Sequence, residues 1–282
     1  MSSSARVIAV IPARAGSKGI PGKNLREVAG RSLVARSIAV ARAARTVDAV
    51  VVSTDGDAIA AEAVAAGARV VRRPVELAED EASSESALLH ALEALSTGDG
   101  TGVGTGVGTP EVLVFLQATS PFTDPVAVDR AVERVLTGSA DAVLAAAPSH
   151  AFLWRTAADG SAVAVNHDAA TRPRRQDREP EYRETGAFYA LRVDGFQAAR
   201  HRFFGRVELA VVPARTAIDI DDVHDLDLAA ALAPLVEPVT AHDHTELRST
   251  APHPDHTEHA RTEHDPTDPH PARTAAAENG AP

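Results

Sequence analysis

The sequence predicts an α/β fold in which a doubly wound, mostly parallel β-sheet is covered by helices on both faces. Short apolar runs recur along the chain, and they lack the alternation of apolar and polar residues that a half-exposed strand would show. Each run is followed by a stretch with helical periodicity, as in successive β-α units. With 282 residues, of which 44% are hydrophobic, the chain is long enough to bury a sizeable core.

The expected elements alternate along the chain. The first strand, Arg6–Pro12, leads through a glycine-rich segment into a helix that starts near Ser32. Gly67 ends the second helix, and Ser83 or Ser84 begins the third. The expected strands are residues 6–12, 49–54, 69–72, 112–116 and 141–147, with further regular structure at 187–192 and 207–212, and the expected helices are 32–45, 57–66, 83–95, 125–136 and 222–232.

Three segments interrupt this order. Residues 98–109 repeat Gly, Thr and Val, which is typical of a flexible loop. The regular pattern weakens after Pro148, and the arginine-rich segment 172–178 is expected to leave the main sheet. Residues 237–282 are rich in Pro, Thr, Asp and His and have almost no large apolar side chains, so they are expected to be a disordered tail. Residues 1–236 are expected to form the folded domain.

Composition and charge limit the possible partners and location. The formal net charge is −11, and the tail contributes −6 of it through nine acidic residues and three arginines, which argues against nucleic acid as the main partner. The chain has no cysteine, so its fold does not depend on an oxidising compartment. The N-terminus lacks the apolar core of a signal peptide, and no run reaches transmembrane length. A cytoplasmic protein without a membrane partner is expected.

The loop that follows the first strand carries an unusual set of residues. The chain has 28 basic residues, of which only two are lysines, and both lie in this loop. Ligands of open α/β folds bind at the carboxyl ends of the strands, and glycines let the backbone approach a phosphate closely. The spacing fits neither the P-loop nor the dinucleotide-binding pattern. A different triphosphate-binding loop is predicted, and its residues are Arg14, Gly16, Lys18, Gly19, Gly22 and Lys23.

A second charged cluster, IDIDD, precedes the last helix. Asp219 and Asp221 are two residues apart in an extended segment, so their side chains point to the same side. Two carboxylates on one side suit Mg²⁺, which takes phosphate oxygens and water as its other ligands. An alternative is that Asp221 or Asp222 caps the helix that begins near Val223. Both interpretations can hold together, with Asp222 as the cap and Asp219 and Asp221 as metal ligands.

Seven motifs in order resemble those of the acylneuraminate cytidylyltransferases, over roughly residues 6 to 234. They are IPARAGSKGIPGKN, VVSTDGDAIAAEA, RRPVELAEDEASSESALLHALE, FLQATSP, RRQD, ETGAFYAL and IDIDDVHDLDLA. The related enzymes that activate an octulosonate lack the SKGIPGKN pattern and fit less well. The resemblance implies transfer of CMP from CTP to a nonulosonic acid, with release of pyrophosphate and a requirement for Mg²⁺. It also implies a nucleotide-diphospho-sugar transferase-like sheet with a small projecting dimerisation arm, roughly residues 148–186, and hence a homodimer.

The resemblance assigns roles to individual residues on the nucleotide side. The positions that match phosphate contacts include Lys23, which would neutralise the charge of the departing pyrophosphate. Asn24 matches a contact to the ribose. Lys23, Arg14 and Asp221 are the residues expected to take part in catalysis, and no histidine is placed as an obvious general base. The phosphate positions are Arg14, Ser17, Lys18 and Lys23, and the positions that would hold cytosine are Arg73, Ala82 and Ser84.

On the acid side, the positions that match substrate contacts are Gln117, Arg175 and Tyr189. A guanidinium is the natural partner of a substrate carboxylate. The chain departs from the family pattern here, with Ala118 in place of a proline, Thr123 in place of an arginine and Thr185 in place of an asparagine. These departures leave open an octulosonate, a phosphonate or another acid as the substrate. A nucleotide-binding homologue without activity is a further alternative, although Lys23, Asp219 and Asp221 are all present.

Overall fold

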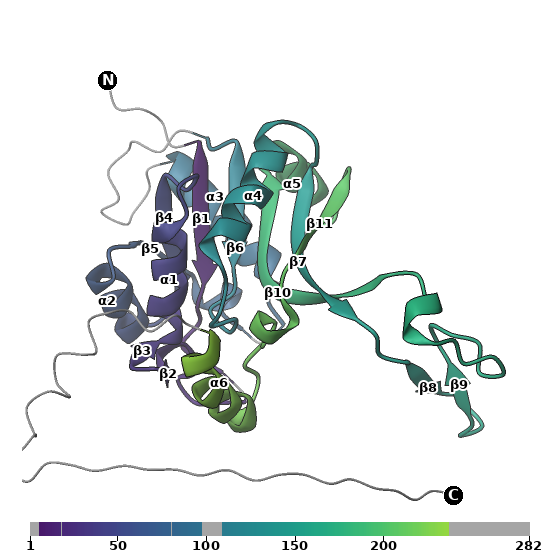
Figure 1. Cartoon of the computed structure of the whole chain (residues 1–282). Coiled ribbons are helices and arrows are strands. Elements are labelled where there is room, and N and C mark those ends of the chain that lie inside the picture. Colours follow the sequence, from purple (N-terminus) through teal and green to yellow (C-terminus); the bar gives the residue numbers. More distant parts are fainter. Residues whose placement is uncertain (1–5, 18, 80, 98–108, 237–282) are drawn as a thin grey trace, which may run out of the picture. The chain divides into compact units, whose positions relative to one another are not determined.

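The computed structural model describes residues 6–17, 19–79, 81–97 and 109–236. A seven-stranded sheet forms its centre, in the order β11-β7-β10-β6-β1-β4-β5 (Figure 1). Five of the seven strands are β1 (Val7–Pro12), β4 (Ala49–Thr54), β5 (Arg69–Arg72), β6 (Val112–Leu116) and β7 (Ala142–Ser149), and the other two are β10 (Glu181–Arg192) and β11 (Val207–Val211). All neighbouring pairs are parallel except those of β10, which runs antiparallel to both β6 and β7. The predicted α/β fold is confirmed.

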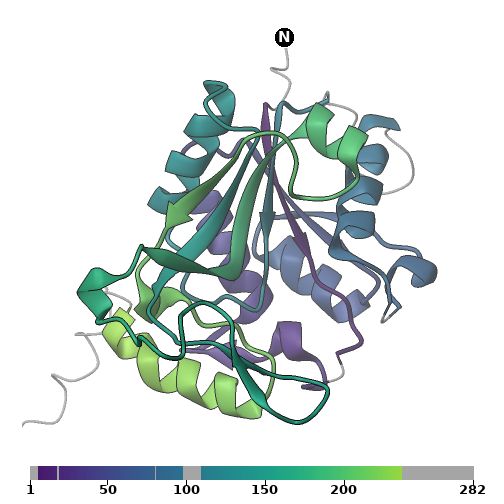
Figure 2. The same cartoon turned by 90° about the vertical axis from the view of Figure 1, so that its right-hand side faces the viewer.

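Helices cover both faces of this sheet. Side chains of β1 alternate between two cores, since Ala9 and Ile11 face one and Ile8 and Val10 face the other. The first core is closed by α1 (Leu33–Ala43), α2 (Asp57–Ala65), α4 (Pro125–Leu136) and α6 (Val223–Val236), and the second by α3 (Ser84–Thr97) and α5 (Val193–Ala199). Figure 2 shows α4 and α3 on opposite sides of the sheet. None of the helices in the described ranges is long and apolar enough to cross a membrane.

Sequence periodicity located most elements, and the predicted ends are confirmed for strands 49–54, 69–72 and 112–116 and for helix 125–136. The other predicted elements differ from the structure by a few residues at one or both ends. The first helix begins at Leu33 because Ser32 caps it, with the Ser32 hydroxyl accepting a hydrogen bond from the Ala35 amide. Four short strands and α5 were not expected from the sequence. The strands are β2 (Glu27–Val28), β3 (Arg31–Ser32), β8 (Trp154–Thr156) and β9 (Ala162–Ala164), and they pair as two small antiparallel hairpins.

An arm leaves the sheet between β7 and β10, as the broken pattern after Pro148 predicted. The β8–β9 hairpin forms its own two-stranded sheet, and Figure 1 shows it standing away from the central strands. Aromatic contacts hold the arm together, because the rings of Phe152 and Trp154 both pack edge-on against His167. Arg172 and Arg178 stack on the ring of Phe152.

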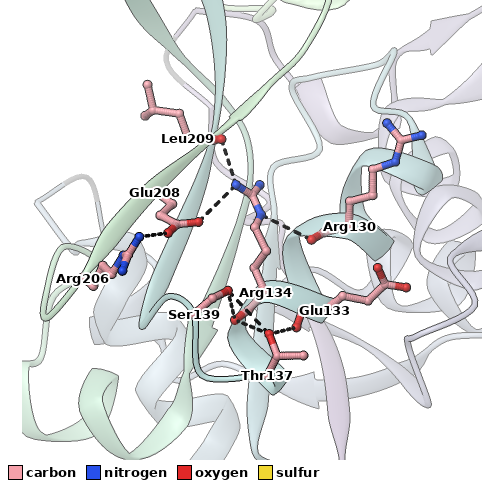
Figure 3. A network of polar contacts seen from close by, with 8 residues as sticks. All are labelled: Arg130, Glu133, Arg134, Thr137, Ser139, Arg206, Glu208 and Leu209. Carbon is pink, nitrogen blue, oxygen red and sulfur yellow. Dashed lines mark hydrogen bonds and ion pairs between the residues drawn. The ribbon is translucent and has the colours of Figure 1, made fainter.

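The outer strand of the sheet is tied to a neighbouring helix. Arg134 of α4 donates a hydrogen bond to the Leu209 carbonyl of β11 at 3.1 Å and pairs with Glu208 at 3.4 Å (Figure 3). Arg206 binds the same carboxylate at 2.9 Å. An arginine that occupies a carbonyl of an edge strand hinders pairing with another chain.

The remaining two predictions, for a flexible loop at 98–109 and a disordered tail at 237–282, fall outside the described residues apart from Thr109.

Candidate active site

The predicted triphosphate loop leaves the sheet at the point where the strand order reverses. From β1 the chain proceeds outward to β4 and β5, and it then crosses back to place β6 on the other side of β1. In open α/β sheets, ligands bind outside the carboxyl ends of the strands at such a switch point. The loop after Pro12 therefore lies where the architecture favours a ligand.

Backbone hydrogen bonds fix the first half of this loop to the neighbouring strand. The Ala13 amide binds the Ser53 carbonyl at 2.9 Å, and the Ala15 amide binds the Asp55 carboxylate at 2.8 Å. Asn24 is buried, and its side-chain amide donates to the Arg14 carbonyl at 2.9 Å. The loop is thus held in shape from both of its ends. The ribose contact of Asn24 stays a prediction.

The second half of the loop meets the acidic segment before α6, which is 198 residues further along the chain. Lys23 donates to the Ile220 carbonyl at 2.8 Å and lies 3.4 Å from the Asp221 carboxylate. Gly19 makes an even closer approach, since a Cβ at this position would lie 2.2 Å from the Asp221 carbonyl oxygen. Only glycine fits at this junction. The structure therefore joins the two clusters that the sequence singled out separately.

The three aspartates of the acidic segment have different roles. Asp222 accepts hydrogen bonds from the amides of His224 and Asp225, so it caps α6 as predicted. Asp225 reaches back to the amides of Asp221 and Asp222, which completes a reciprocal cap. The carboxylates of Asp219 and Asp221 take no part in this cap. The two interpretations of the segment are thus compatible.

Asp219 suits the metal interpretation. Its Oδ1 atom is buried and has no hydrogen-bond partner in the described part of the chain. Burial raises its pKa; the Thr119 hydroxyl opposes this shift, the charge of Asp221 adds to it, and Lys23 opposes it. A cation would relieve both the repulsion and the unmet hydrogen-bonding need. Within the described ranges no group of three or more His, Asp or Glu side chains could hold a metal, and two carboxylates with phosphate oxygens are a typical Mg²⁺ ligand set.

The residues expected to contact the base lie on one connection. Arg73 directly follows β5, and its guanidinium donates to the Ser53 carbonyl at 2.7 Å and to the Ser53 hydroxyl at 3.2 Å. Burial lowers its pKa, with Asp55 opposing and Arg14 adding to this effect. Ala82 and Ser84 lie at the start of α3, where the Ser83 hydroxyl caps the helix by accepting from the Ser86 amide. Their contacts to cytosine stay predictions.

On the acid side, Gln117 and Asp219 both lie close to a bulge in β10. The register of β10 against β7 shifts between Glu184 and Tyr189. Within this bulge Gly186 has a φ of 74°, and a Cβ there would lie 2.9 Å from the Gln117 amide oxygen and 3.7 Å from the Asp219 carboxylate. Gln117 is thereby placed beside the metal-binding candidate.

Thr185, one of the departures from the family pattern, is buried in the same bulge. Its hydroxyl donates to the Ala145 carbonyl at 3.1 Å and accepts from the Ala187 amide at 3.3 Å. The side chain therefore stabilises the backbone of the bulge. No contact of Thr185 to a substrate is needed to explain this residue.

The other two acid-side candidates, Tyr189 and Arg175, lie in different parts of the structure. Tyr189 is only 2% exposed; its ring stacks on Phe115, and its hydroxyl donates to the Glu184 carboxylate. Arg175 lies in a short 3₁₀ helix, Arg175–Asp177, on the arm and is exposed. Of the phosphate candidates, Ser17 is half-buried, and Lys18 lies outside the described residues. The substrate roles of all four stay predictions.

Sequence reasoning missed three residues at this site. Asp55 follows the strand VVVST directly, so the rule that located the first loop would also have found it. Gly186 and Arg202 carried no comparable signal. Arg202 pairs with Glu85 at 2.7 Å and covers the rings of Phe115 and Tyr189, and these partners are distant in the sequence.

These features define an α/β protein in which a loop rich in glycine and basic residues lies against a pair of carboxylates at the carboxyl ends of the strands. The chain belongs to the cytidylyltransferase family, whose model matches residues 8–221. It is 35% identical to N-acylneuraminate cytidylyltransferase A of Danio rerio over 189 residues, covering 66% of this chain and 41% of that protein. It is 40% identical to CMP-N,N'-diacetyllegionaminic acid synthase of Legionella pneumophila over 128 residues, covering 45% and 52%. The chain thus spans about half the length of these relatives or less.

A solved structure supports the fold. The structure of CMP:2-keto-3-deoxy-manno-octonic acid synthetase complexed with CTP is similar, with a TM-score of 0.60 and 18% sequence identity. The similarity covers 80% of this chain and 98% of the other. The two proteins therefore share the fold of the central sheet and its helices.

Proposed function

We propose that this protein transfers CMP from CTP to the anomeric hydroxyl of a nonulosonic acid and releases pyrophosphate. The observation that carries the proposal is the junction where Lys23 and Gly19 meet Asp221. The same segment carries the buried oxygen of Asp219, which has no hydrogen-bond partner among the described residues. A loop rich in positive charge and a pair of carboxylates at one strand edge form a site for a metal-bound triphosphate.

Each part of the site has a task in this reaction. Asp219 and Asp221 would hold Mg²⁺, which when bound neutralises charge on the phosphate oxygens. Arg14, Ser17, Lys18 and Lys23 would bind the phosphates, with Asn24 on the ribose. The substrate oxygen forms a bond to the α-phosphorus while the bond to the departing pyrophosphate breaks, and the hydroxyl proton passes to a carboxylate. Lys23 stabilises the leaving group, because its Nζ already points to the carboxylate edge.

The nonulosonic acid is proposed from the relatives. The two proteins named above act, by their names, in making CMP conjugates of an acylneuraminic and a legionaminic acid. Arg73, Ala82 and Ser84 would select cytosine, and Gln117, Arg175 and Tyr189 would contact the acid. A different acid, such as an octulosonate or a phosphonate, is the second candidate, because Ala118 and Thr123 depart from the family pattern.

We also propose a homodimer formed through the arm. Leu153, Trp154, Val165 and Tyr182 are large hydrophobic side chains that lie exposed on the arm or at its base. Apolar side chains grouped in this way are typical of an interaction surface. Arg175 lies on the same segment, so a second copy could bring it to an acid site. We also propose a cytoplasmic location, with which a fold that does not depend on disulfides is compatible.

The test is pyrophosphate release with CTP, Mg²⁺ and a panel of 2-keto acid sugars and phosphonates. We expect turnover with at least one nonulosonic acid, none with UTP or ATP, and loss of activity on chelation of the metal. Turnover only with an octulosonate or a phosphonate would favour the second candidate. No turnover with any acid, in a preparation that binds CTP, would support a nucleotide-binding homologue without activity.

A further inference from the structure

A chain of polar contacts runs through the second core, between the candidate base site and the acid side. Its centre is Arg202, in the segment between α5 and β11. On one side Arg202 pairs with Glu85, with 2.7 Å between Nε and the carboxylate. On the other side its guanidinium lies over two stacked rings, 4.7 Å from the centroid of Tyr189 and 5.1 Å from that of Phe115.

The Glu85 end of this chain reaches the base site. Glu85 is the second residue of α3 and directly follows Ser84, a candidate contact to cytosine. The pair is largely shielded, because the side chains of Arg202 and Glu85 are 17% and 16% exposed. Burial alone would raise the pKa of Glu85, but the hydrogen bond from Arg202, a hydrogen bond from the backbone and the charges of Arg202 and His201 together lower that pKa. The first turn of α3 is therefore anchored to Arg202 by an ionised pair.

The Tyr189 end of the chain reaches the acid side. The Tyr189 hydroxyl donates to Glu184, which is two residues from Gly186 in the bulge of β10. Burial, together with the Glu184 carboxylate, raises the pKa of Tyr189 although Arg202 opposes this shift, so the hydroxyl stays protonated and keeps this hydrogen bond. Arg202 holds the ring that carries this hydroxyl against Phe115 of β6.

We propose that Arg202 is a positioning residue that fixes the cytosine-binding turn of α3 and the acid-side bulge of β10 relative to each other. The inference rests on the proposed function for what the two sides bind. A guanidinium suits this place because it is planar, so it stacks on an aromatic ring while its edge binds a carboxylate. An ammonium group could pair with Glu85, but it would not stack on the rings in the same way.

The test compares four variants by two measurements. The first is the Kd for CTP, measured by titration calorimetry without the acid, and the second is the KM for the acid in pyrophosphate release. Arg202→Met should raise both constants by roughly fivefold. Glu85→Gln should raise only the Kd for CTP. Arg202→Lys should bring the Kd for CTP back toward the wild-type value and leave the KM for the acid raised.

Arg134→Met is the matched control. Arg134 is also a partly buried arginine in an ion pair, with Glu208, but it lies at the outer edge of the sheet (Figure 3). The Arg134→Met substitution should leave the Kd for CTP and the KM for the acid unchanged, even if it lowers the melting temperature.

A purely structural role for Arg202 would lower Tm and the active fraction, with both constants unchanged, and that result would overturn the inference. An equal effect of Arg134→Met would also overturn it. If wild-type protein turns over no acid, the proposed function fails instead, while the Kd for CTP in Glu85→Gln and Arg202→Lys still tests the link to α3.

Discussion

The nucleotide side and the acid side of the site are built in different ways. On the nucleotide side, the loop after β1 is held by hydrogen bonds from Ala13, Ala15 and Asn24, all within one half of the sheet. On the acid side, Gln117 lies at the end of β6, whereas Arg175 lies exposed on the arm. The residues proposed for the nucleotide side therefore lie together in the central domain, whereas those proposed for the acid side are divided between the sheet and the arm.

This difference has a chemical basis. Phosphates are bound by backbone amides, cations and metals at strand ends, which the parallel sheet supplies directly. Recognition of one acid among many needs side chains on several surfaces, and such surfaces vary without disturbing the sheet. Substitutions on the nucleotide side should therefore affect every substrate alike, and substitutions on the arm should affect the acid alone.

The largest expected effect is that of Lys23→Ala. Removal of the cation that we propose stabilises the leaving group should lower kcat by about 100- to 1,000-fold with every acid tested. Pyrophosphate release at saturating CTP measures this loss.

Lys23 also binds the Ile220 carbonyl, so thermal unfolding of the variant is the necessary control. A folded variant with near-normal kcat would contradict the role assigned to the loop.

Asp219→Asn should have the next largest effect. The substitution keeps the shape of the side chain and removes one of the two negative charges that we propose hold Mg²⁺. The Mg²⁺ concentration for half-maximal activity should rise by about tenfold or more, again with every acid.

Asp222→Asn is the matched control, since Asp222 caps α6 and asparagine caps a helix equally well. An unchanged Mg²⁺ dependence in Asp219→Asn would remove Asp219 from the metal site.

Gly19→Ala tests the junction between the loop and the acidic segment. A Cβ would lie 2.2 Å from the Asp221 carbonyl, so the two segments must separate and the site must open. We expect the KM for CTP to rise by about tenfold or more, because a displacement on the order of 1 Å can cost up to about 100-fold.

Gly16→Ala provides the comparison in the same loop, because a Cβ at Gly16 meets nothing within 4 Å. Equal effects of the two substitutions would show that a Cβ anywhere in this loop disturbs CTP binding, and that the close contact at Gly19 adds nothing specific.

The positions of the residues proposed for the nucleotide side were easier to predict from the sequence than the geometry around those proposed for the acid side, and the reason is physical. A buried parallel strand followed by glycines and lysines is a local pattern, and so are two aspartates at a spacing of two. The direction of β10 is not local, because the run Ala187–Arg192 is equally apolar whether it pairs parallel or antiparallel. The arm sets the direction of β10, because it returns the chain from the end of β7 to the start of β10.

Contacts distant in sequence were hidden for the same reason. Arg202 and Glu85 are 117 residues apart, and no periodicity links them. The junction of Lys23 with Asp221 was also not predicted, although both residues were selected as functional. Their selection came from residue type and local spacing, whereas their contact depends on the order of the strands.

The smallest expected effect, on the arm, tests the comparison most directly. Leu153→Asp places a charge among the exposed apolar side chains of the arm, and Leu153 itself is 51% exposed, so the fold should tolerate it. Sedimentation should show a shift from dimer to monomer, and the KM for the acid should rise several-fold. The Kd for CTP should stay unchanged, because the nucleotide side lies within one chain.

Val64→Asp is the control for the arm, since Val64 is 64% exposed on α2, beside the nucleotide half of the sheet. It should change neither the association state nor either constant. A monomeric Leu153→Asp variant with a normal KM for the acid would show that the acid site is complete in one copy. Arg175 would then act from its own chain or not at all, and the division between the two sides would lie within the protomer.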